Sequence, residues 1–220
     1  MTTSSSGYRA GIRRIAPLAP AAASFGIAFG VLADTAGMSA PASIVMSATT
    51  FAGAAQFAAT GILRDDGTVV AAVTAAVLLN LRYLAISFAI APVFEGSRLK
   101  RLFESQLIVD ESWAVSQVGG GRIDRKMLVG AGLVLFPFWV GGTVLGALAG
   151  EVLGDPEQLG LDAAFPALFL ALLATQLVNR RAVIAAVAGA TIALALLPIA
   201  PAGVPVIAAG AVCLAGLWKR

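Results

Sequence analysis

The stretch TVVAAVTAAVLLNLRYLAISFAIAPVF at residues 68–94 decides the fold class of this chain. An α-helix needs about 20 predominantly apolar residues to span the hydrocarbon core of a bilayer, and this stretch exceeds that length. Its apolar run is continuous and rich in alanine and leucine, whereas a transmembrane strand alternates apolar and polar residues. The stretch therefore predicts a membrane-spanning helix.

The composition extends this prediction to the whole chain. Of its 220 residues, 59% are hydrophobic and 12% are charged, whereas soluble domains carry about 25% charged residues. We predict an all-α polytopic membrane protein with a bundle of about 6–8 transmembrane helices in a single transmembrane domain over residues 1–220. The predicted spans lie near residues 15–33, 41–63, 68–94, 128–150, 162–178, 182–197 and 202–218.

The basic residues flank the apolar runs, as cytoplasmic anchors do, and are not gathered on a soluble face that would bind nucleic acid. The formal net charge is only +3. Clusters at residues 9–14, 122–126, 180–181 and 219–220 predict that both termini are cytoplasmic. Residues 151–162 carry four carboxylates and no basic residue, so this loop is expected outside.

This topology requires an even number of crossings between Arg14 and Arg122, yet three long apolar runs lie there. One solution is a broken or re-entrant helix within residues 41–94. The other is that the amphipathic segment 102–118 crosses the membrane as an extra helix. The polar residues SATT at 47–50 and Gly53 favour the broken helix, because irregular backbone at membrane depth is tolerated where it lines a cavity.

Small residues predict close helix packing. Gly142, Gly146 and Gly150 form two consecutive G-x-x-x-G steps, and Gly26 with Gly30 forms another. Such faces allow helix backbones to approach closely. We expect the partners to lie within the chain.

Two absences limit the chemistry. The chain has no histidine, which excludes a His-ligated metal, a Ser-His or Cys-His nucleophile and a histidine proton relay. Its one cysteine, Cys213, is expected to be a small buried apolar residue. No nucleophile, metal or cofactor motif is recognisable, so we predict that the chain is not an enzyme and has no catalytic residue, no metal and no cofactor.

Polar residues within the apolar runs are the candidates for substrate binding. Arg82 costs about 2.5–3.5 kcal/mol at a helix centre, so it should face a partner or a water-filled cavity. Asn80 and Tyr83 would line the same cavity if the backbone unwinds there. In the segment FAGAAQF, Gly53 leaves room for a ligand and Gln56 would bond its polar end. Plain helix packing is the alternative for Gln56.

Carboxylates are the candidate proton carriers. Asp110 and Glu111 are adjacent, and two neighbouring charges in a low dielectric favour retention of a proton on one of them. A solvated amphipathic helix is the alternative reading. Asp162 is a third candidate, although helix capping also explains an aspartate before Pro166. Arg82 is predicted either to bind the substrate carboxylate or to form a permanent ion pair with Asp110, Glu111 or Asp162.

Four segments carry a family resemblance: FAGAAQF (51–57), LLNLRYL (78–84), LIVDESWAV (107–115) and LDAAFPALFLALL (161–173). In this order, and with the closing GLWKR, they resemble the segments of the AzlC family over essentially the whole chain. The family pattern carries over to Gln56, Arg82, Asp110, Glu111, Asp162 and Pro166.

The resemblance implies a secondary-transport permease subunit of the bacterial inner membrane. It would export branched-chain amino acids (valine, leucine, isoleucine) or other apolar amino acids, together with a small hydrophobic AzlD-type partner. The alternative function is a channel-like or accessory membrane subunit whose transport pathway lies mainly in its partner.

Overall fold

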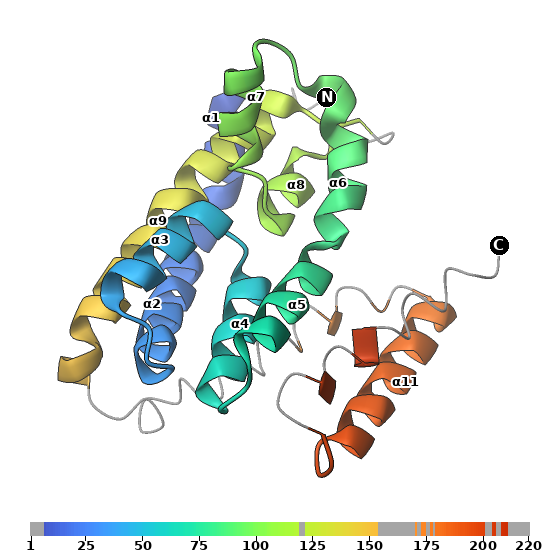
Figure 1. Cartoon of the computed structure of the whole chain (residues 1–220). Coiled ribbons are helices and arrows are strands. Elements are labelled where there is room, and N and C mark those ends of the chain that lie inside the picture. Colours follow the sequence, from blue (N-terminus) through green and yellow to red (C-terminus); the bar gives the residue numbers. More distant parts are fainter. Residues whose placement is uncertain are drawn as a thin grey trace. The chain divides into compact units, whose positions relative to one another are not determined.

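A computed structural model describes residues 7–118, 122–153, 170, 173–174, 177, 179–200, 204–205 and 208–210 (Figure 1). This part of the chain is helical and contains no strand beyond an isolated antiparallel bridge between Gln117 and Ile123. The prediction of an all-α membrane protein is confirmed. Three stretches are long and apolar enough to cross a membrane, namely Tyr8–Thr35, Val69–Val93 and Arg125–Ala149.

The chain divides into two compact units. The first comprises Met1–Asp34, Met38–Gly53 and Leu81–Val152, and the second comprises Thr35–Gly37, Ala54–Asn80 and Leu153–Arg220. The helices of the first unit are α1 (Tyr8–Ile15), η1 (Ala16–Leu18), α2 (Ala19–Thr35), α3 (Ala40–Thr50), α6 (Arg82–Ile90), η2 (Ala91–Val93), α7 (Arg98–Ser105), α8 (Asp110–Ser116) and α9 (Arg125–Leu153). Those of the second, within the described residues, include α4 (Gly53–Arg64), α5 (Val69–Asn80) and α11 (Arg180–Leu196).

The predicted span at 41–63 is two helices, because the backbone breaks between α3 and α4. Phe51 at the break has φ 40° and ψ 48°, a left-handed conformation that is costly for a residue with a bulky side chain. Packing holds it there, since the buried Phe51 ring meets the Phe136 ring edge-on with centroids 5.1 Å apart. A broken helix within residues 41–94 is thus present, whereas its re-entrant path stays a prediction.

The predicted span at 68–94 is also interrupted. Helix α5 ends at Asn80, α6 begins at Arg82, and Leu81 separates them while keeping right-handed helical angles. The amide of Leu84 bonds the carbonyl of Leu81 at 3.0 Å, the i to i+3 spacing of a tightened turn. Arg82 therefore stands at the first position of a new helix.

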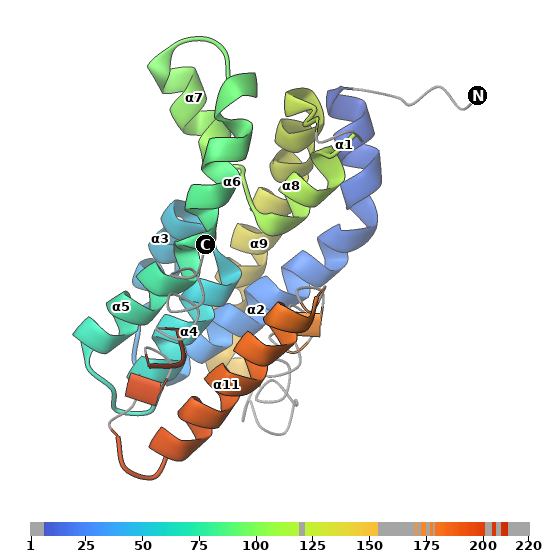
Figure 2. The ribbon, with the colours of Figure 1, turned by 90° about the vertical axis from the view of Figure 1, so that its right-hand side faces the viewer.

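Helices α2 and α9 lie side by side in both views of the ribbon (Figure 1, Figure 2). Their glycines make this possible: a Cβ built on Gly142 would lie 3.1 Å from the Cα of Gly26, and one on Gly146 would lie 3.0 Å from the Cα of Ile27. The predicted close packing of Gly26, Gly30, Gly142 and Gly146 therefore occurs within the chain. Helix α3 also contacts α9, because the buried hydroxyls of Ser47 on α3 and Thr143 on α9 are hydrogen-bonded at 2.8 Å.

The start of α9 is tied to its neighbours by charge. Asp124 accepts a hydrogen bond from the Met127 amide at 3.1 Å and so caps the helix. The Arg125 guanidinium donates from Nε to Glu104 of α7 at 2.9 Å, and a second bond from Nη2 makes the pair bidentate. Glu104 is buried, so this pair fixes α7 on the first unit.

Candidate functional site

The candidate site is centred on an ion pair between the first residues of two helices. Nη2 of Arg82 on α6 lies 2.9 Å from Oδ2 of Asp110 on α8, and each side chain is about one third exposed. Asp110 lies in the first turn of its helix, where the backbone N–H groups and the helix dipole favour a negative charge. Figure 2 shows α8 beside α6 within the first unit.

The guanidinium of Arg82 has donors to spare. Its Cζ lies 5.2 Å from the centroid of the Tyr83 ring, an arrangement that favours a cation over the ring face. Its Nε is buried and has no hydrogen-bond partner among the described residues. Arginine presents five N–H donors in a planar fork, and the contact with Asp110 uses Nη2. The remaining donors of Arg82 can therefore bind a second anion.

The helices that carry the pair, α6 and α8, both contribute to an apolar cluster. Ile86, Ile90, Leu128 and Val129 form a buried cluster, against which Tyr83 and Trp113 pack. The indole N–H of Trp113 is also buried without a partner among the described residues. A buried polar atom of this kind calls for a water molecule or a ligand group, so each of these two donors can bind one.

Asp110 is suited to hold a proton. Helix α8 lies outside the three stretches that are long enough to cross a membrane. Burial raises the pKa of Asp110 above its ordinary value, and the positive charge of Arg82 offsets this effect only in part. Glu111, the next residue of α8, is exposed. Of the three carboxylates predicted to pair with Arg82, Asp110 is the one that does so within the described residues.

The predicted site residues are divided between the two units. Tyr83, Asp110 and Glu111 accompany Arg82 in the first unit, whereas Gln56 and Asn80 belong to the second. Gln56 is fully buried in α4, and its backbone carbonyl accepts a bond from the Thr60 hydroxyl at 2.9 Å. The side-chain oxygen of Asn80 is buried and has no hydrogen-bond partner in the described part of the chain.

Gly53 has a packing role in the first unit. A Cβ built on it would lie 2.7 Å from the Trp139 ring, so a larger residue would collide with α9. Several predictions lie outside what the structure describes: those on Asp162, Pro166 and Cys213, and most of the predicted spans at 162–178 and 202–218. The packing predicted for Gly150 is also outside it, although its backbone belongs to α9.

Gln106 has a role in the fold that its place in the sequence does not indicate. Its amide nitrogen donates to the carbonyls of Ala48 and Thr49, both at 2.9 Å, at the end of α3. The last carbonyls of a helix have no partner within it, so Gln106 satisfies two of those exposed by the break at Phe51. Nothing in the sequence spacing points to this contact, because Gln106 and Ala48 are 58 positions apart.

An apolar helical bundle with membrane-spanning stretches and a charged pair at helix starts defines a polytopic helical membrane protein. The family model described as AzlC protein matches residues 17–153. The chain therefore belongs to the AzlC family, and the resemblance found in its sequence is confirmed.

Relatives of known sequence agree with this assignment. An "Uncharacterized membrane protein" of Archaeoglobus fulgidus is 35% identical over 86% of this chain and 84% of its own length. The "Branched-chain amino acid transport protein AzlC" of Bacillus subtilis is 25% identical over 78% of this chain and 68% of its own. The "Inner membrane protein YgaZ" of Escherichia coli is 28% identical over 84% and 79%, respectively. No solved structure matches the chain.

Proposed function

We propose that this chain is the large permease subunit of a secondary transporter that exports branched-chain or other apolar amino acids. The Arg82–Asp110 pair is the observation that carries the proposal, because it offers a cation with spare donors beside a carboxylate that can take a proton. Such a substrate has one carboxylate, one ammonium and an apolar side chain. The name of the Bacillus subtilis relative, a branched-chain amino acid transport protein, supports this class of substrate.

In the proposed mechanism the substrate carboxylate competes with Asp110 for the guanidinium of Arg82. An arginine fork binds a carboxylate in bidentate fashion, so the substrate can take the place of the internal partner. Asp110 then loses its neighbouring positive charge while it remains partly buried. Its affinity for a proton rises, and a proton from water binds its free carboxylate oxygen. Substrate binding and proton uptake are thereby coupled through one residue.

The other predicted residues have subordinate roles in this proposal. Tyr83, Asn80, Gln56 and Gly53 remain proposed substrate-binding residues, and Glu111 and Asp162 remain proposed proton carriers beside Asp110. A small AzlD-type membrane protein would complete the transporter in the bacterial inner membrane. Both termini would be cytoplasmic.

Labelled leucine in proteoliposomes tests the function. The chain, reconstituted alone and with its small partner, should catalyse counterflow of leucine and net efflux driven by a pH gradient that is acidic on the side from which leucine leaves. Arg82→Gln should lose both activities, whereas Asp110→Asn should lose net efflux and retain more of the exchange. Arg64→Gln is the control, because Arg64 pairs with an exposed neighbour, Asp65. Transport by the partner alone would instead favour an accessory subunit.

The topology needs a separate experiment. In a Cys213→Ala background, a cysteine introduced at position 157 should react with an impermeant maleimide added from outside intact cells. Reaction only after the cytoplasmic side is opened would contradict the proposed orientation.

A further inference from the structure

Helix α7 carries two features that the transport proposal does not use. Its apolar residues Leu99, Leu102 and Phe103 are 62%, 65% and 67% exposed. Its basic residues are Arg98, Lys100 and Arg101. An amphipathic helix of this composition, with exposed apolar side chains beside cations, is typical of the membrane–water interface.

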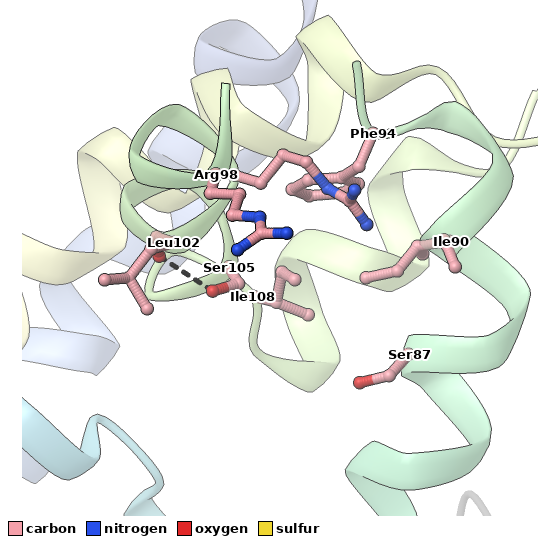
Figure 3. Close-up of a pocket in the computed structure, with 9 residues that line it drawn as sticks. Ser87, Ile90, Phe94, Arg98, Leu102, Ser105 and Ile108 are labelled. Carbon is pink, nitrogen blue, oxygen red and sulfur yellow. Dashed lines mark hydrogen bonds between the residues drawn. The ribbon is translucent and has the colours of Figure 1, made fainter. Parts of the chain in front are cut away.

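A groove of about 360 Å³ separates α7 from the end of α6 (Figure 3). Arg98 and Leu102 lie on the α7 side, facing Ser87 and Ile90 of α6 across the groove. Phe94 and Ile108 also line the groove. All of these residues belong to the first unit.

The charge of the groove is one-sided. Arg98 and Arg101 are the charged residues among those that line it. Within the described part of the chain, their side chains form no ion pair. The carboxylate of α7 itself, Glu104, is buried and pairs with Arg125. Two guanidinium groups therefore face the groove, and none of the described residues supplies an anion that pairs with them.

We infer that this groove binds the head group of an anionic phospholipid. The phosphate would lie between the guanidinium groups of Arg98 and Arg101, each of which can bind phosphate oxygens through its fork. The start of an acyl chain would lie against Ile90, Leu102 and Ile108. Basic pockets between membrane helices bind acidic lipids for this reason, and the exposed apolar face of α7 would keep the groove at the depth of the head groups.

The test measures binding of a fluorescent phosphatidylglycerol to the full chain in an uncharged detergent. A basic residue in contact with an acidic head group contributes about fivefold in affinity, so Arg98→Gln/Arg101→Gln should weaken binding by about 25-fold. Lys100→Gln/Arg122→Gln removes the same charge from exposed residues that do not line the groove. This control should lose no more than about threefold, because it keeps the paired guanidinium groups.

A second variant guards against a folding defect. Arg98→Lys/Arg101→Lys keeps the charge and should bind within about fivefold of the unchanged chain. Melting temperatures of all variants should agree, since both arginines are exposed.

Four outcomes would overturn the inference. An equal loss in the control pair would mean that only diffuse charge attracts the lipid, and equal binding of phosphatidylcholine would remove the requirement for an acidic head group. Inorganic phosphate and a salt without phosphate are also compared as competitors in the same uncharged detergent. If phosphate displaces the lipid at a 10-fold lower concentration than the other salt, the groove is a simple anion site. Displacement by leucine would indicate that the groove belongs to the transport path.

Discussion

Replacing Arg82 with glutamine removes the cation of the Arg82–Asp110 pair and leaves the carboxylate without its counter-charge. At about 4 Å and an effective dielectric constant of 20, two unit charges attract by about 4 kcal/mol, and the loss of hydration offsets much of this gain. Exposed pairs contribute about 0.2–1 kcal/mol, whereas removal of one partner from a buried pair costs about 3–5 kcal/mol. With 34% and 32% of the two side chains exposed, we expect a coupling of about 1–2 kcal/mol.

A double-mutant cycle measures this coupling. The unfolding free energies of Arg82→Gln, Asp110→Asn and the double variant are compared with that of the unchanged chain in the same detergent. The pair of Arg64 and Asp65 is a matched control, because its atoms lie 3.4 Å apart and its side chains are 45% and 64% exposed. Its coupling should be about 0–0.5 kcal/mol.

Leucine affinity of the same variants separates the two roles of Arg82. If the pair only stabilises the fold, Arg82→Gln should unfold more easily and its folded fraction should bind leucine normally. If Arg82 also binds substrate, the folded variant should lose most of its affinity, and Arg82→Lys should recover part of it because it keeps the charge without the fork. A coupling below about 0.5 kcal/mol together with unchanged leucine affinity would refute both roles.

Three further predictions follow from the described contacts. Burial raises the pKa of Asp110 above its ordinary value of 3.8, so the stability that its proton contributes is present below pH 3.8 and is lost as the pH rises through the folded-state pKa. Over this pH range the melting temperature of Asp110→Asn should therefore fall less than that of the unchanged chain. Parallel melting curves against pH for the two proteins would contradict the raised pKa. Gly142→Ala should cost about 1–3 kcal/mol of stability through collision with α2, whereas Gly141→Ala, whose Cβ would meet nothing within 4 Å, should be nearly neutral in the same unfolding assay. Gln106→Ala should lower the free energy of unfolding by about 1–3 kcal/mol, because two carbonyls of α3 lose their donor. Gln117 is exposed and provides the control. An equal loss of stability in Gln117→Ala would show that the Gln106 contact does not stabilise the break.

The membrane class follows from the amino-acid sequence, since the length of an apolar run is set by the thickness of the bilayer and can be read without any tertiary contact. The sequence also located the close-packed faces of Gly26 and Gly142, because glycines four positions apart lie on one side of a helix. The cost of a charge at membrane depth singled out Arg82.

Tertiary structure decided what those residues meet. Asp110, Glu111 and Asp162 were equivalent partners for Arg82 in sequence terms, and the packing of α8 beside α6 brought Asp110 to 2.9 Å. The break at Phe51 falls between the two features that favoured it in the sequence, SATT at 47–50 and Gly53. What holds it there could not be predicted, because the Phe136 ring and the Gln106 amide come from distant segments. Such contacts follow from the path of the connecting loops, and local sequence periodicity carries no information about that path.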